Sequence, residues 1–149
     1  MKGSAVFDTL LIAIDEDSHA HTAAQIGGRL AQDLQGDVIL FHVVPPPPTY
    51  ALQAGFYLPP GELRKAATEY GKELLQEAAK HLPEGVPSRL VVKYGEHSAW
   101  REIVQMAERE LADLIVIGAH SQGTLTRPTL GSTAEKVSRH VKVPILLVR

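Results

Sequence analysis

Five short apolar runs are spaced along the 149 residues of this chain, and segments with helical periodicity separate them. A run that is apolar in nearly every position is typical of a strand buried on both faces of a parallel sheet. We therefore expect five β-strands, at residues 9–14, 38–44, 89–94, 113–118 and 143–148. The run at 89–94 has charged ends and the run at 143–148 comes last in the chain, so we expect both at sheet edges.

Apolar residues also recur three and four positions apart between these runs, which predicts four helices. The first helix spans residues 18–35, and Gly36 follows it, where a left-handed C-terminal cap is expected. The last helix runs from about Ser132 to His140. The residues expected to face the core from the second and third helices are Leu63, Ala67, Tyr70, Leu74, Ala78, Leu82, Ile103, Val104, Ala107 and Leu111.

Strands that alternate with helices indicate an α/β fold, in which helices cover both faces of a mostly parallel sheet through right-handed crossovers. To cover both faces the winding must reverse once, and ligands bind at that reversal, beyond the carboxyl ends of the strands. The two most apolar strands, which lead to Asp15 and Gly118, are the best candidates to flank it. The sequence predicts one domain over residues 1–149, a three-layer αβα sandwich.

Composition argues against several classes of partner. Fifteen basic and 17 acidic side chains give a net charge of −2, which does not favour nucleic acid or an anionic membrane. The chain has no cysteine, which excludes disulfides, thiolate metal sites and a cysteine nucleophile. No apolar run approaches the roughly 20 residues that span a bilayer, and the first residues lack the apolar core of a signal peptide. We therefore expect a cytoplasmic protein.

The segment from Gly118 to Glu135 carries the clearest functional signal. A buried strand ends at a glycine, a polar loop follows, and Ser132 with Glu135 has the spacing of a capping box that starts a helix. The free amides of a helix's first turn carry partial positive charge, and glycine lets a ligand approach the main chain. This arrangement favours a phosphate-bearing ligand, although a capping box also occurs in proteins that bind nothing.

Other polar residues leave alternatives open. Asp15 either caps the first helix or holds Mg²⁺ that bridges phosphates. Arg127 either contacts phosphate or stays in solvent. We expect the seven histidines to be solvated rather than metal-bound, because His19 and His21 do not share a helix face. Trp100 is most simply a core residue.

Asp15 after the first strand, the His42-Val43-Val44 end of the second, and Gly118-Ala-His-Ser with Gly131-Ser132 resemble the universal stress protein family, essentially end to end. The resemblance implies a five-stranded sheet of order 3-2-1-4-5 in the adenine nucleotide alpha hydrolase-like fold, and a homodimer formed through the last strand. Members that bind ATP carry glycine, two residues, glycine, nine residues, then glycine with serine or threonine. Here Gly118 and Gly131-Ser132 keep the spacing, but Ser121 replaces the second glycine.

Family positions imply a role for each matching residue. By this resemblance Asp15 lies near the ribose or a metal ion, Val43 binds adenine through its backbone, and Ile117 lines the base pocket. Serine tolerates positive φ less well than glycine but can donate a hydroxyl to phosphate, so Ser121 either preserves or abolishes binding. The residues implied to surround the ribose and phosphates are Gly118, Ser121, Gly131, Ser132 and Thr133.

Two functional hypotheses follow from the resemblance. The first is a stress-response protein that binds ATP with Mg²⁺ at the reversal and serves as a nucleotide-sensing regulatory module. Its hydrolysis would be slow at most, because no phosphate-binding lysine or positioned base is identifiable. The second is a dimeric interaction module without nucleotide. A small hydrolase that uses His120 and Ser121 ranks behind both, since adjacent loop residues seldom align as nucleophile and base.

Overall fold

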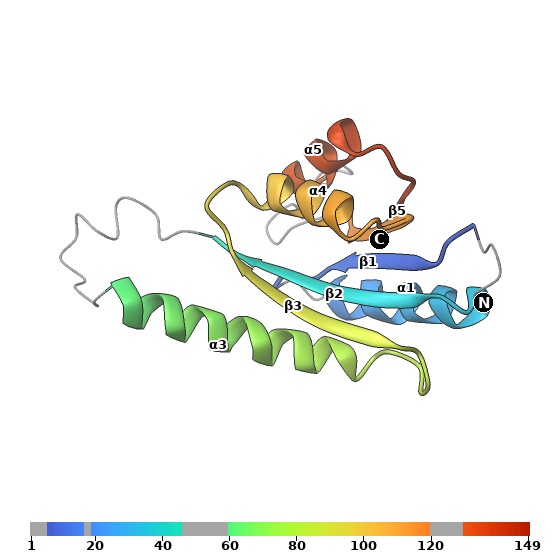
Figure 1. Ribbon diagram of the computed structural model, residues 1–149, viewed down its shortest axis with the longest axis horizontal. Helices are drawn as coiled ribbons and strands as arrows, with labels where there is room; N and C mark the ends of the chain where they lie inside the picture. Colours follow the sequence, from blue (N-terminus) through green and yellow to red (C-terminus); the bar gives the residue numbers. More distant parts are fainter. Residues whose placement is uncertain (1–5, 17–18, 46–59, 120–129) are drawn as a thin grey trace.

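The computed structural model describes residues 6–16, 19–45, 60–119 and 130–149. Within these residues, five parallel strands form one sheet of order β3-β2-β1-β4-β5, and helices cover both of its faces (Figure 1). The expected three-layer sandwich, strand order and edge strands are confirmed. The elements are β1 Thr9–Ala13, α1 His19–Leu34, β2 Asp37–Val44, α3 Pro60–Ala79, β3 Ser88–Tyr94, α4 Ala99–Arg109, β4 Leu114–Gly118, α5 Ser132–His140 and β5 Ile145–Val148.

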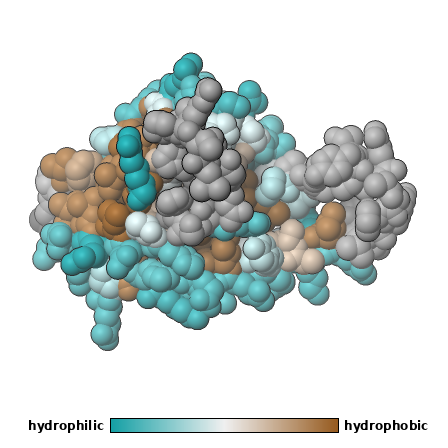
Figure 2. Space-filling model, turned by 180° about the vertical axis from the view of Figure 1, so that it is seen from behind, coloured by the Kyte–Doolittle hydropathy of each residue, from teal (hydrophilic) through white to brown (hydrophobic). Residues whose placement is uncertain are grey.

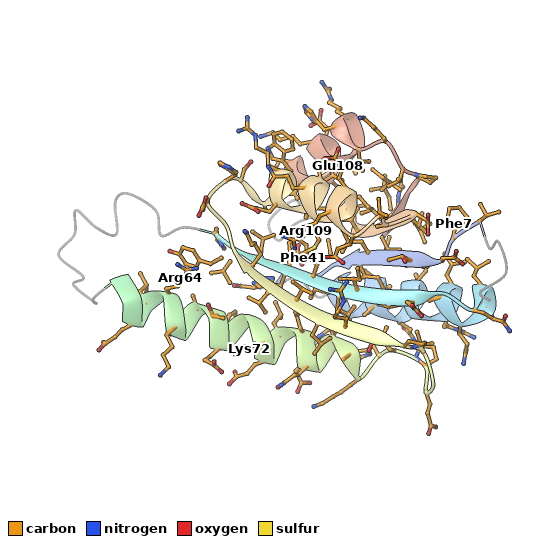
Figure 3. All side chains as sticks on the ribbon, in the orientation of Figure 1. Phe7, Phe41, Arg64, Lys72, Glu108 and Arg109 are labelled. Atoms are coloured by element: carbon orange, nitrogen blue, oxygen red, sulfur yellow. The ribbon has the colours of Figure 1, made fainter. Side chains whose placement is uncertain are left out.

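The core has two halves because successive side chains of a strand point to opposite faces of the sheet. Leu10 and Ile12 of β1 pack with α1 and α3, whereas Leu11 packs with α4 and α5. All three side chains are fully buried, as expected for a central parallel strand. Phe41 of β2 is 1% exposed and lies beneath α4 (Figure 3).

The reversal of winding lies between β1 and β4, as predicted. These strands are neighbours, β2 and β3 continue the sheet on one side, and β5 continues it on the other. At the amino-terminal ends of these two strands, one Asp113 carboxylate oxygen accepts hydrogen bonds from the amides of Asp8 and Thr9, each 2.9 Å long. This contact ties the start of β1 to the start of β4.

The end of α1 differs from the expectation that Gly36 would be left-handed. Gln35 has that conformation, with φ 56°, and the Gly36 amide donates to the Ala31 carbonyl at 2.9 Å. Gly36 is instead needed for space, because a Cβ there would lie 3.0 Å from the Asp8 carbonyl oxygen. The hydrogen bonds of the helix end therefore select the left-handed residue, one position before the glycine.

Two residues expected in the core are exposed. Leu111 is 81% exposed and has φ 52°, because α4 has already ended at Arg109 and Leu111 occupies the left-handed cap. Tyr70 is 49% exposed, because its neighbour Gly71 is the residue that faces the sheet at this point of α3. A Cβ at Gly71 would lie 2.9 Å from Cγ1 of Val92, so the larger neighbouring side chain faces outward.

Among the described residues, no helix is both long enough and apolar enough to cross a membrane.

Candidate functional site

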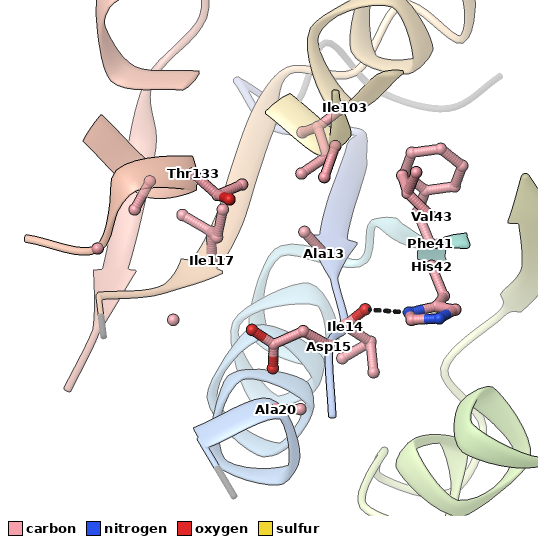
Figure 4. Close-up of a pocket in the computed structure, with 14 residues that line it drawn as sticks. Ala13, Ile14, Asp15, Ala20, Phe41, His42, Val43, Ile103, Ile117 and Thr133 are labelled. Atoms are coloured by element: carbon pink, nitrogen blue, oxygen red, sulfur yellow. Dashed lines mark hydrogen bonds between the residues drawn. The ribbon is translucent and has the colours of Figure 1, made fainter. Parts of the chain in front are cut away.

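A cleft opens at the carboxyl ends of β1 and β4, where the winding reverses (Figure 4). It holds about 670 Å³ of empty space, a volume that includes the solvent at its open mouth. Among the described residues, the ends of three strands and the first turns of three helices line it. The residues proposed from the sequence that line it are Asp15, Val43, Ile117, Gly118, Gly131 and Thr133.

The other proposed residues have different positions. Ser132 is exposed and does not line the cleft, although it lies between two residues that do. Ser121 and Arg127 lie outside the described residues, as does His120. The structure therefore leaves the roles expected of these three residues as predictions.

The inner part of the cleft is apolar. Val43 at the end of β2, Ile103 of α4 and Ile117 of β4 all line it and are almost completely buried. Figure 4 shows these three side chains arranged around Ala13, whose small side chain leaves the space between them open. A flat apolar group such as a nucleobase suits walls of this kind.

The N-terminus of α5 forms another wall, but the predicted capping box is wrong. Ser132 is the first helical residue, and Gly131 is the N-cap, with φ −59° and ψ 149°. The Gly131 amide donates to the Ala119 carbonyl at 2.7 Å. This bond holds Gly131 in place as the N-cap, one residue before the expected N-cap, Ser132. Glu135 pairs with Arg139 at 2.8 Å, and no side-chain hydrogen bond caps the helix among the described residues.

Asp15 supplies the carboxylate of the site. It follows β1 by two residues, is exposed at the mouth, and points toward the side where Ile117 and Thr133 lie (Figure 4). The described residues bring together no group of three His, Cys, Asp or Glu side chains that could hold a metal ion. A cation at Asp15 would therefore need further oxygen ligands from its own ligand or from water.

His42 is a cleft residue to which the sequence assigned no role in the site, and the expectation that it is solvated is wrong. It is 6% exposed, and its Nδ1 lies 2.8 Å from the Ile14 carbonyl oxygen (Figure 4). Because a carbonyl only accepts, Nδ1 carries the hydrogen and donates it. This bond anchors the backbone immediately before Asp15. Its position inside an apolar strand run was the available signal.

The remaining unpredicted lining residues are apolar or small. Phe41, Ala99 and Ile103 reach the cleft from β2 and α4. Their sequence patterns indicated burial, but did not indicate that they would line the cleft at the carboxyl ends of the strands.

Comparison with known proteins identifies the family. The chain matches the family model described as the universal stress protein family over residues 7–149. Universal stress protein MJ0531 of Methanocaldococcus jannaschii is 32% identical over 149 residues, which cover 99% of this chain and 85% of that protein. The solved structure of protein MJ0577 of the same organism has a TM-score of 0.80 at 26% identity and covers 96% of each chain.

Two further solved structures share the fold and contain nucleotides. A universal stress protein in complex with cAMP has a TM-score of 0.61 at 22% identity and covers 96% of this chain and 97% of that one. The universal stress protein from Archaeoglobus fulgidus in complex with dAMP has a TM-score of 0.62 at 16% identity and covers 97% and 99%. Together with the sheet order, the structural matches confirm the adenine nucleotide alpha hydrolase-like fold. The chain belongs to the universal stress protein family.

Proposed function

We propose that the cleft binds an adenine nucleotide, ATP with Mg²⁺, and that the protein acts as a nucleotide-sensing regulatory module in the stress response. One observation carries this proposal. At the reversal point, an apolar slot adjoins a helix N-terminus whose N-cap has no side chain. The complexes of related folds with cAMP and dAMP support the choice of ligand.

The two parts of the cleft suit the two ends of a nucleotide. The base would lie among Val43, Ile103 and Ile117, where burial excludes water. The ribose and phosphates would extend toward Gly118 and the segment Gly131 to Thr133, where backbone amides and the helix dipole favour negative charge. Ser121 and Arg127 would join the phosphate contacts from the loop outside the described residues.

The carboxylate fits a magnesium ion bound together with phosphates. Mg²⁺ in nucleotide sites is held by one or two carboxylates, phosphate oxygens and several waters, so a single exposed carboxylate is sufficient. Asp15 meets this requirement at the mouth of the cleft. When bound, Mg²⁺ would neutralise phosphate charge.

We expect ATP hydrolysis to be slow at most. None of the described lining residues is a lysine or arginine that could stabilise transferred phosphate. Phosphate release should therefore be slow, consistent with a sensor rather than an enzyme.

Isothermal titration with ATP and Mg²⁺ tests the proposal. We expect saturable binding by the native protein and none by Gly131→Val, because a branched side chain would occupy the space of a phosphate. The φ and ψ of Gly131 are accessible to any L-residue, and circular dichroism should establish that this variant, at a buried position, is folded. Absence of heat with the native protein at high micromolar ATP would favour the alternative, an interaction module without nucleotide.

We also propose a homodimer formed through β5, in either functional hypothesis. This strand is at the edge of the sheet and pairs only with β4 among the described strands. Leu147 is 39% exposed, and Figure 2 shows apolar side chains gathered at the end of the molecule that carries β5. An uncovered apolar edge favours antiparallel pairing about a two-fold axis. Light scattering that detects only monomer at micromolar concentration would exclude this dimer.

A further inference from the structure

A second groove lies on the outer surface of the α4–α5 layer. It is lined mainly by Trp100 and Arg101 of α4 and by Glu135, Lys136, Arg139 and His140 of α5. In Figure 3, nitrogen-tipped side chains project from this layer, away from the sheet. The groove is separate from the nucleotide cleft, although α4 and α5 contribute to both.

Trp100 provides an apolar platform at the groove. It is the only tryptophan of the chain, and it is half-buried rather than enclosed in the core as the sequence suggested. One part of the side chain packs on the core, and the ring centroid lies 4.4 Å from that of His140. The Arg101 guanidinium carbon lies 5.2 Å from the indole centroid. A partly exposed indole held in this way suits the apolar anchor of a partner.

The groove concentrates positive charge on an acidic protein. Its permanent charges are those of Arg101, Lys136 and Arg139 against one carboxylate, Glu135, in a chain of net charge −2. Arg139 is paired with that carboxylate at 2.8 Å, while among the described residues neither Arg101 nor Lys136 forms an ion pair. The positive charge of these two side chains is therefore available to an external carboxylate.

Helix stability does not account for this charge. Arg101 lies in the first turn of α4, where a cation opposes the helix macrodipole. Lys136 lies in the middle of α5, so the dipole gives it little benefit. Only Arg139 and His140, in the last turn of α5, have positions that the dipole favours.

We propose that this groove docks an acidic segment of a partner protein, with aspartate or glutamate side chains on Arg101 and Lys136 and an apolar side chain on Trp100. Charge complementarity selects this occupant. Nucleic acid fits less well, because three cations neutralise few phosphates and the rest of the protein is acidic. The proposal does not depend on nucleotide binding.

Trp100 makes the test specific to the groove, because no other tryptophan contributes to the fluorescence. The probe is a synthetic glutamate-rich peptide with one central leucine, titrated at about 0.15 M ionic strength. We expect a saturable change in Trp100 fluorescence, and a loss of affinity of about tenfold or more in Lys136→Glu.

The matched control is Lys65→Glu, which makes the same charge change at an exposed position of α3, on the opposite face of the sheet (Figure 1). It should bind the peptide like the native protein, and circular dichroism should show both variants folded. Equal weakening by both variants would reveal only long-range attraction and would overturn the proposal. An unchanged fluorescence signal, or tighter binding of a single-stranded DNA oligonucleotide than of the peptide, would also overturn it.

Discussion

Replacing Gly131 by serine should separate the stability of the protein from its ligand affinity. Gly131 is the N-cap of α5, and its φ of −59° and ψ of 149° are those of an ordinary N-cap residue. Serine can adopt this conformation without strain, and its hydroxyl can accept a hydrogen bond from an amide two or three residues later. In the proposed complex these same amides face the phosphates.

The two effects differ in sign and size. A serine N-cap stabilises a helix by a few tenths of a kcal/mol relative to glycine. Loss of one backbone donor to a charged phosphate oxygen costs about 1.5–3 kcal/mol. Since about 1.4 kcal/mol corresponds to a tenfold change, Gly131→Ser should bind ATP roughly ten- to a hundredfold more weakly while unfolding at a slightly higher temperature.

Isothermal titration and thermal denaturation measure the two effects on one sample. Ser138→Ala is the control, because the Ser138 hydroxyl donates to the Glu135 carbonyl at 2.6 Å on the exposed side of the same helix. Alanine is the better helix former, so this variant should change the melting temperature and leave ATP affinity intact. Native affinity in a stabilised Gly131→Ser protein would show that the ligand does not use these amides. A lowered melting temperature would refute the capping argument.

Four further changes have defined outcomes. Asp113→Ala should lower the free energy of unfolding by about 2–4 kcal/mol in urea titrations, because two partly buried amides lose their acceptor, and Asp113→Asn should cost less. The hydrogen bond from Arg89 lowers the pKa of Glu110, so the stability difference between native protein and Arg89→Ala should be complete above the ordinary carboxyl pKa of about 4.3 and should vanish as pH falls through the lower folded value. Asp15→Asn should remove the Mg²⁺ dependence of ATP affinity while metal-free ATP binds about as before. Leu147→Lys should give a monomer in light scattering with the fold intact.

The sequence predicted the features that depend on local pattern. Continuous apolar runs indicated buried parallel strands, and the alternation of strands with helices required one reversal of winding. These two arguments predict a cleft between Asp15 and Gly118, and the structure has one there. The order of all five strands came from the family resemblance rather than from periodicity.

Features that depend on tertiary contacts could not be predicted in this way. The left-handed residue after α1 is Gln35, because two helix-end hydrogen bonds determine its position and the glycine beside it is needed for close packing. The spacing of Tyr70 predicts an inward position, but its neighbour Gly71 faces the sheet instead and lies against Val92. Apolar spacing defines such a face only to within about one residue, or 100° of rotation.

The side chains of the candidate site show the same difference between positions that topology predicts and positions that depend on tertiary contacts. Residues at strand ends, such as Asp15 and Ile117, follow from topology, because the carboxyl ends of parallel strands share one edge. Ile103 enters the cleft because of the way α4 packs on the sheet, which no local pattern specifies. His42 lies in a strand as expected, but only its Ile14 partner explains how a polar ring is accommodated there.

Two short hydrogen bonds connect the proposed nucleotide site with the proposed dimer edge. The Gly131 amide donates to the Ala119 carbonyl, and the Ala119 amide donates to the Val148 carbonyl, each at 2.7 Å. Val148 is the last residue of β5 and is buried, so a displacement of the edge strand reaches the N-cap of α5 through one intervening residue. If pairing of β5 moves Ala119 and with it the N-cap of α5 so that nucleotide affinity changes, linkage requires that nucleotide change dimer stability by the same factor. The two parts of the proposed function therefore have a physical route by which one can control the other.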